Sequence, residues 1–178
     1  SVTPRHINPH IEYDDCCASL PNEENELSLA LPQGMAISAD GETLYVAALG
    51  SDKIGVFDTH TLEQGMHWPD PAEQLVVSGG GPTAVLLDES RHRLYVLTRF
   101  DNAISAISTT TGDEVQHLSM YNPEPASVTA GRRFLYDAGL TSSHGDQACA
   151  SCHVSGDMDH IAWDLGNPDD NLMTAPGP

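Results

Sequence analysis

The sequence predicts a mainly β protein, with two four-stranded blades of a partial β-propeller and a small C-terminal segment of helix and loop. Two observations predict this fold class. The chain repeats itself at an offset of 50 residues, and each repeat alternates short apolar runs with turn residues. A Cys-x-x-Cys-His motif at 149–153 lies outside the repeat. We therefore expect an N-terminal segment (1–30), two blades (31–120) and a C-terminal segment (121–178).

The repeat is clearest in one strand of each blade. Leu44-Tyr45-Val46 aligns without a gap on Leu94-Tyr95-Val96, and Ile54 aligns on Ile104. Four antiparallel strands in a period of 40–50 residues are typical of a propeller blade. The N-terminal segment offers one extra strand, around 7–13. The strands expected in the blades are 35–38, 43–48, 53–58 and 74–78, followed by 84–87, 93–98, 103–108 and 114–118.

The C-terminal motif is the attachment signature of a c-type haem. In this chemistry each thiol adds to one haem vinyl group and the adjacent imidazole ligates the iron. The motif therefore predicts one haem c, with Cys149 and Cys152 as covalent anchors and His153 as the proximal iron ligand. A zinc site that adds His144 and His160, or a redox dithiol, is the alternative. The zinc site leaves the histidine directly after Cys152 unexplained, and the dithiol would be expected in a βαβ unit, which the sequence does not indicate.

The sixth iron ligand decides the chemistry, because methionine raises the reduction potential and an open position admits peroxide. Two residues of this chain are candidates for this distal position. Met173 lies 20 residues after His153, which is far enough to reach the other haem face, and His160 ranks second. A residue from another chain is the third alternative.

Acidic residues gather around the motif, and calcium prefers such oxygen ligands. Their spacing matches no EF-hand loop, so we expect a solvated acidic face and keep calcium as the weaker alternative. The residues are Asp157, Asp159, Asp164, Asp169 and Asp170.

Charge and cysteine content narrow the class of partner and the compartment. The chain has 26 acidic and 7 basic residues, a formal net charge of −19, which disfavours nucleic acid and anionic lipid and suits a basic redox partner. No apolar run is long enough for a membrane span. Haem attachment of this kind takes place outside the cytoplasm, so we expect a periplasmic or extracellular protein. For Cys16 and Cys17 a vicinal disulfide, bonds to another chain and free thiols all stay open.

Both halves of the chain resemble known families. Residues 34–63, with Tyr45-Val46-Ala47-Ala48 in the signature strand, resemble a blade of the YVTN family of β-propellers, and Tyr95-Val96-Leu97-Thr98 marks the second blade. In both strands the last two of these four residues differ from the family signature. The stretch 133–153 resembles the haem-binding segments of the di-haem cytochrome c peroxidase superfamily.

The resemblances imply an architecture of propeller blades followed by a cytochrome c segment, and the haem motif leads us to expect an extracytoplasmic c-type cytochrome that transfers electrons through one haem. The first alternative is part of a di-haem peroxidase-like oxidoreductase, although this chain has only one Cys-x-x-Cys-His motif. The second is a structural or assembly propeller that carries haem. Two blades leave open edges and do not close a propeller. We therefore expect another chain or copy to complete the propeller and the haem pocket, unless the chain is a fragment or a processed product.

Overall fold

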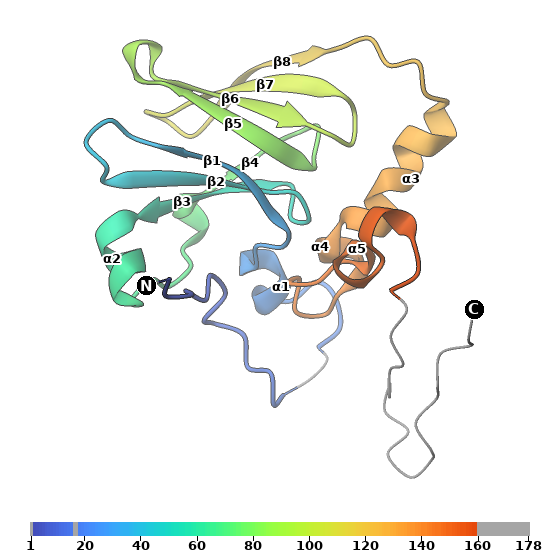
Figure 1. Cartoon of the computed structure of the whole chain (residues 1–178), viewed down its shortest axis with the longest axis horizontal. Helices are drawn as coiled ribbons and strands as arrows, with labels where there is room; N and C mark the ends of the chain where they lie inside the picture. Colours follow the sequence, from blue (N-terminus) through green and yellow to red (C-terminus); the bar gives the residue numbers. More distant parts are fainter. Residues whose placement is uncertain (1, 16–17, 160–178) are drawn as a thin grey trace.

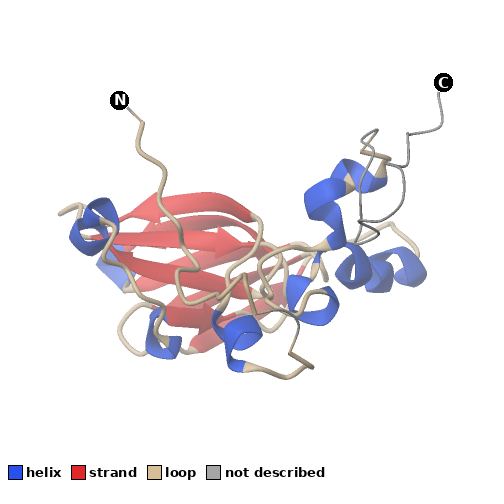
Figure 2. Ribbon diagram, turned by 90° about the horizontal axis from the view of Figure 1, so that it is seen from below, coloured by secondary structure: helices blue, strands red, loops and turns tan. Residues whose placement is uncertain are grey.

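The strands form two antiparallel sheets that stack face to face, with the helices around them (Figures 1 and 2). The computed structural model describes residues 2–15 and 18–159. Strand order follows the chain in both sheets. The prediction of a mainly β, partial propeller is confirmed. The strands are β1 (Pro32–Ile37), β2 (Thr43–Ala48), β3 (Lys53–Asp58) and β4 (Gln74–Val76), then β5 (Pro82–Asp88), β6 (Arg93–Thr98), β7 (Ala103–Ser108) and β8 (Glu114–Ser119).

The helices are short and lie outside the strand layers, with α3, α4 and α5 gathered on one side (Figure 1). None of the described helices has the length and apolar composition needed to cross a membrane. The α-helices are α1 (Glu23–Leu27), α2 (Thr59–Gln64), α3 (Ala126–Tyr136), α4 (Ala138–Thr141) and α5 (Cys149–Cys152); the 3₁₀ turns are η1 (Pro71–Glu73), η2 (Glu89–Arg91) and η3 (Val154–Gly156).

The sequence repeat is also a repeat of geometry. Strands β2 and β3 pair from Thr43↔Asp58 to Ala48↔Lys53, and β6 and β7 pair in the equivalent register. Both hairpins turn through a residue with positive φ, Asp52 at 53° and Asn102 at 54°. Asp and Asn tolerate this left-handed conformation better than other side chains that carry a Cβ. The two blades therefore share turn chemistry as well as strand pattern.

The main core lies between the two sheets. Alternate residues of a strand point to opposite faces. In the first sheet Tyr45 and Ile54 therefore point toward the second, where they meet Leu94, Val96 and Ile107. All five side chains are buried.

The two outer faces differ. The outer face of the first sheet is covered over β2 and β3 by the N-terminal segment and α2, where Ile7, Leu29 and Leu62 pack on Val46 and Phe57, whereas Met35 and Ile37 of β1 stay exposed. The outer face of the second sheet leaves large apolar side chains exposed; these include Leu86, Leu97, Ile104 and Leu118. The pair of blades is therefore covered in part at one end and uncovered at the other.

The extra strand expected around 7–13 is wrong: these residues form turns and irregular backbone. The side chain of Asn8 makes the hydrogen bonds that backbone pairing would make in a strand. Its amide donates to Leu29 O at 2.9 Å, and its oxygen accepts from Leu29 N–H at 2.8 Å. Pro9 has no N–H to donate. Asn8 therefore attaches the segment to the chain just before the first sheet, and apolar contacts of Ile7 with the sheet add to this.

Candidate cofactor-attachment site

The Cys-x-x-Cys-His motif forms α5, a single helical turn, and the residue that ends it. Residues three apart on a helix are neighbours on its surface, so the thiols of Cys149 and Cys152 lie on one side of the turn. The His153 N–H donates to Cys149 O at 2.9 Å. Both cysteines are unpaired and exposed, and His153 is exposed as well. The three groups are thus adjacent and accessible, as covalent attachment of a haem requires.

The two residues between the cysteines hold the turn. Ser151 Oγ accepts from Ala148 N–H at 3.1 Å, and Ser151 N–H donates to Ala148 O at 2.9 Å. Ala150 is buried. The small residues between the cysteines therefore fix the backbone while both thiols face solvent.

The imidazole of His153 is oriented by one contact. Its Nδ1 lies 3.1 Å from Asp157 O. A carbonyl oxygen only accepts, so Nδ1 carries the proton and Nε2 keeps its lone pair. Within 2–15 and 18–159, Nε2 has no hydrogen-bond partner. A histidine held this way by a backbone carbonyl is typical of metal ligands.

The elements next to the motif carry exposed apolar side chains. Helix α3 packs against α5, and Gly156 lies beside Leu135 of α3. The exposed side chains on α3, on α4 and after α5 are Val128, Phe134, Leu140, Val154 and Met158. This environment suits a large apolar ring bound through the thiols.

The loop before the motif is held by residues 8–15 and 18–28, which we call the N-terminal brace. The brace runs beneath the first sheet toward α4 and α5 (Figure 1). Gly145 has φ +71°, and a Cβ there would lie 2.8 Å from Asn25 O, so only glycine fits. The side-chain contacts are Asn25 Nδ2 to Ser142 O (2.7 Å), Asn22 Nδ2 to Ser143 O (3.0 Å), Glu24 Oε2 to His144 Nδ1 (2.7 Å) and Tyr13 OH to Asp146 Oδ2 (2.9 Å).

The structure separates the other predicted site residues. His144, weighed as a zinc ligand, is paired with Glu24. In the part of the chain that the structure describes, no three His, Cys, Asp or Glu side chains are grouped to hold a metal. Of the five acidic residues considered for calcium, Asp157 and Asp159 are described. The residues expected as a distal ligand or in a vicinal disulfide, and the other three acidic residues, lie outside the described ones; these are His160, Met173, Cys16, Cys17, Asp164, Asp169 and Asp170.

We expect acid to loosen the loop at 139–146. The Glu12 N–H and then His144 hold the pKa of Glu24 below its usual value of 4.5. A carboxyl with a lowered pKa stabilises the folded state above its unfolded pKa, and this contribution is lost as the pH falls through the folded pKa. Amides at 139–146 should therefore exchange faster in Glu24→Gln than in the wild type at neutral pH, and the difference should shrink as the pH falls through the lowered pKa of Glu24.

Asp40 is the matched control for this prediction. Its pKa is also lowered, chiefly by the Ser38 hydroxyl, but it lies in a blade turn far from the brace. Asp40→Asn should leave exchange at 139–146 unchanged. Equal exchange in Glu24→Gln and the wild type at neutral pH would contradict a role for Glu24 in holding the loop.

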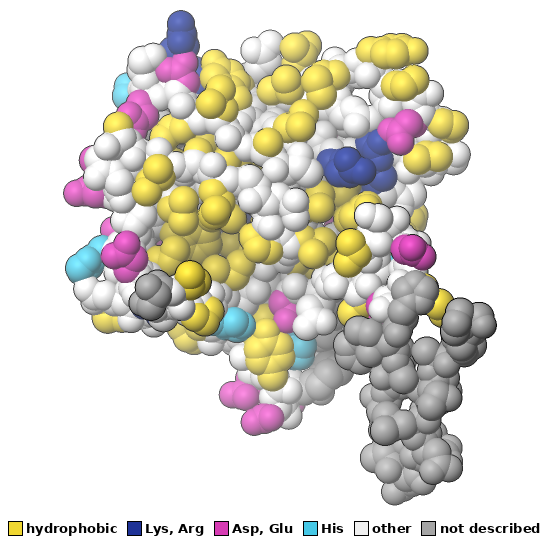
Figure 3. All heavy atoms as spheres, in the orientation of Figure 1, with side chains coloured by type: hydrophobic (Ala, Val, Ile, Leu, Met, Phe, Trp, Pro, Cys, Tyr) yellow, Lys and Arg dark blue, Asp and Glu magenta, His cyan; other side chains and the backbone are white. Residues whose placement is uncertain are grey.

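Paired arginines connect α3 to the blades. Arg133 lies between Asp52 at 2.7 Å and the buried Asp137 at 3.1 Å, and Arg132 contacts Glu124 and Asn102. Basic side chains are visible at this junction in Figure 3. Burial raises the pKa of Asp52, whereas the Gly81 N–H and Arg133 lower it. These ion pairs and hydrogen bonds therefore hold α3, the helix that packs against α5, in place against the blades.

The structure also brings together a serine, a histidine and an aspartate that the sequence did not reveal. Ser105 Oγ lies 2.8 Å from His117 Nδ1, and His117 Nε2 lies 2.6 Å from Asp101 Oδ2. Ser105 is 0% exposed, and its hydroxyl contacts Nδ1 of His117. In a catalytic triad the serine hydroxyl contacts Nε2 of the histidine instead. The network therefore fastens β8 to the β6–β7 turn. Only the strand register, which pairs Ser105 with His117, could have predicted it.

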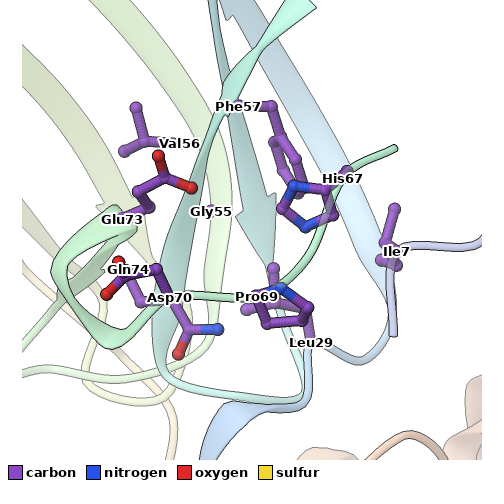
Figure 4. A pocket seen from close by; sticks show the side chains of 10 residues that line it. All are labelled: Ile7, Leu29, Gly55, Val56, Phe57, His67, Pro69, Asp70, Glu73 and Gln74. Atoms are coloured by element: carbon purple, nitrogen blue, oxygen red, sulfur yellow. The ribbon is translucent and has the colours of Figure 1, made fainter. Parts of the chain in front are cut away.

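Two hollows lie away from the motif. The first, under the first sheet, has a volume of about 10 Å³, room for about one water molecule. There the ring of His67 lies 4.7 Å from that of Phe57, and burial lowers the His67 pKa (Figure 4). A more open hollow of about 560 Å³ lies beside α1 and β4, with Trp68 on its wall. No residue of 149–153 lines either one.

Among known proteins, the chain is similar only to a set of solved structures. No protein-family model matches the chain, and no curated protein matches it. Kuenenia stuttgartiensis hydrazine synthase is 16% identical, with a TM-score of 0.45 over 61% of this chain and 28% of that one. The periplasmic gluconolactonase of Pseudomonas aeruginosa is 18% identical, with a TM-score of 0.42 over 53% and 27%. A putative 6-phosphogluconolactonase of Bacteroides uniformis is 17% identical, with a TM-score of 0.41 over 53% and 31%.

The chain thus spans less than a third of the length of each of these proteins. The likeness of these proteins to the chain lies in their propeller-like folds. It gives no support for a cytochrome c or peroxidase resemblance of the C-terminal segment.

Proposed function

We propose that this chain is an extracytoplasmic c-type cytochrome in which Cys149 and Cys152 hold one haem and His153 ligates its iron. The observation that carries the proposal is the geometry of α5. Two exposed thiols share one helical turn, and the adjacent imidazole is oriented through Nδ1 so that Nε2 is free to bind. When bound, a haem supplies a one-electron redox centre.

The rest of the chain holds this motif in place. The N-terminal brace fixes the loop before it, and the Asp52–Arg133–Asp137 contacts fix α3 against the blades. Met173 and His160 remain the candidates of this chain for the sixth ligand, and a residue of another chain remains the alternative. The sixth ligand separates electron transfer from peroxidase chemistry.

The net charge of −19 supports a basic redox partner, whose encounter such a field accelerates. A periplasmic or extracellular location follows from the attachment chemistry that we propose. The two blades support completion of the propeller by further sheet on another chain or copy.

Visible absorption spectra of the ferric and ferrous protein test the proposal. We expect bands of a low-spin, six-coordinate haem that neither carbon monoxide nor peroxide changes. A high-spin haem that binds these ligands would favour the peroxidase-like alternative. An intact mass equal to that of the bare polypeptide, after expression with haem-attachment machinery, would overturn the proposal.

A further inference from the structure

We propose that the open hollow beside α1 and β4 is a docking site for a basic protein, and that it binds a lysine or arginine side chain of this partner. The inference requires neither a haem nor a redox partner. It combines unpaired acidic side chains, an uncovered indole and an open strand edge, which meet at this place. The lining residues that carry the argument are Glu23, Glu26, Lys53, Trp68, Gln74 and Val76.

The floor of the hollow belongs to the first sheet. Gln74 and Val76 are two residues apart on β4 and therefore share one face of the sheet. Lys53 of β3 is paired directly with Val76. Helix α1 forms one wall, and the segment 68–71 forms another. The volume of about 560 Å³ is that of a ligand pocket, so a long side chain fits.

Two carboxylates on α1 select a cation. Glu23 and Glu26 are three residues apart, so their side chains lie on one side of the helix. Both residues are exposed, and within 2–15 and 18–159 neither carboxylate makes a salt bridge or accepts a hydrogen bond. They are therefore available to a positive group that enters from outside.

Lys53 does not neutralise this wall. Its Nζ contacts Glu26 O and donates to Gln74 Oε1 at 3.0 Å, so the ammonium is already bound inside the hollow. Burial lowers the pKa of Lys53, and the charges of Glu26 and Asp52, which act from further away, raise it. One ammonium is set against two carboxylates, which leaves a net negative charge in the hollow.

The indole of Trp68 supplies a second attraction for a cation. A guanidinium or ammonium group is attracted to the face of an aromatic ring, and tryptophan is the strongest such partner. Trp68 is 64% exposed on the wall of the hollow. Beside it, Pro69 and Pro71 offer apolar surface to the alkyl stem of a lysine or arginine.

The open edge of β4 favours a cation that is carried by a protein over a free amine. Val77 N–H donates to Asp52 O at 3.0 Å, and hydrogen-bonded pairs alternate along antiparallel strands. The N–H and C=O of Val76 therefore point away from β3, toward the edge at which the strand order of this sheet ends. An extended segment of a partner can pair with such an edge while its side chain enters the hollow. The net charge of −19 attracts a basic partner.

NMR titration of the isotope-labelled full chain with a capped Gly-Gly-Arg-Gly-Gly peptide tests the proposal. The indole N–H of Trp68 and the amide of Val76 should shift and saturate with a dissociation constant of roughly 1 mM, because one exposed ion pair and one cation–π contact are weak. The same peptide with uncharged citrulline in place of arginine should bind at least tenfold more weakly. Butylammonium, the free counterpart of the lysine side chain, should bind at least fivefold more weakly, because it has no backbone to pair with β4.

Charge variants locate the site. Glu23→Gln combined with Glu26→Gln should weaken binding of the arginine peptide about tenfold, and Trp68→Leu should weaken it about fivefold, as measured at the Val76 amide. Glu42→Gln combined with Asp113→Asn is the matched control. It also removes two exposed carboxylates, but in turns of the blades away from the hollow, so its affinity should stay within about twofold of the wild type.

The comparison of peptides uses the wild type and is independent of how the variants fold. Equal affinity for the arginine and citrulline peptides, or the absence of shifts at Trp68 and Val76, would overturn the proposal. Wild-type affinity in the folded α1 double variant would overturn it as well. Butylammonium that binds as tightly as the peptide would assign the hollow to a free amine and overturn the docking of a protein there.

Discussion

Replacing both Cys149 and Cys152 by serine should abolish covalent haem. A serine hydroxyl does not form the thioether by which each thiol attaches to a vinyl group, and no other cysteine lies near α5 among the described residues. The single variants should each keep one bond, because the two thiols are separate on the exposed side of the turn. Intact mass and the visible spectrum after denaturation measure covalent attachment directly.

The second pair of cysteines is the matched control. Cys16→Ser combined with Cys17→Ser should retain the haem mass, because neither residue belongs to the attachment motif. Haem bands that survive denaturation in the Cys149→Ser, Cys152→Ser double variant would contradict the assignment of these two thiols as the anchors.

The strands were predictable because their information is local. The bounds of β2, β3, β6 and β7 agree with the sequence prediction residue for residue, since an alternating apolar pattern and a turn residue define each end. Strands β1 and β5 begin earlier than predicted, at Pro32 and Pro82, because proline is tolerated as the first residue of a strand. Helix α2 also has local signals that were not used: Asp58 caps its start and Gly65, with φ +70°, ends it.

The candidate site was predictable only where its residues are neighbours in the sequence. Cys149, Cys152 and His153 occupy one turn, so their spacing was enough to identify them. The contacts that hold this turn were not predictable, because Glu24 and His144 are 120 residues apart. Likewise, the side chain of Asn8 makes hydrogen bonds with the backbone of Leu29, whereas a predicted strand at 7–13 would pair through its backbone. Such contacts depend on tertiary packing, which periodicity does not describe.

The repeat also provides a stability experiment with an internal control, which compares Ile54→Ala with Ile104→Ala. Ile54 is fully buried between the sheets, so its truncation should destabilise the fold by about 2–4 kcal/mol, because it removes apolar contacts and leaves a cavity. This is a large fraction of the roughly 5–15 kcal/mol that stabilises a typical domain. Ile104 occupies the equivalent position on the uncovered face, so the same change there should cost less than about 1 kcal/mol in the monomer. Urea unfolding at low protein concentration measures both values. Equal losses would show that the sheets do not pack in the order described, because only that order buries one isoleucine and exposes the other.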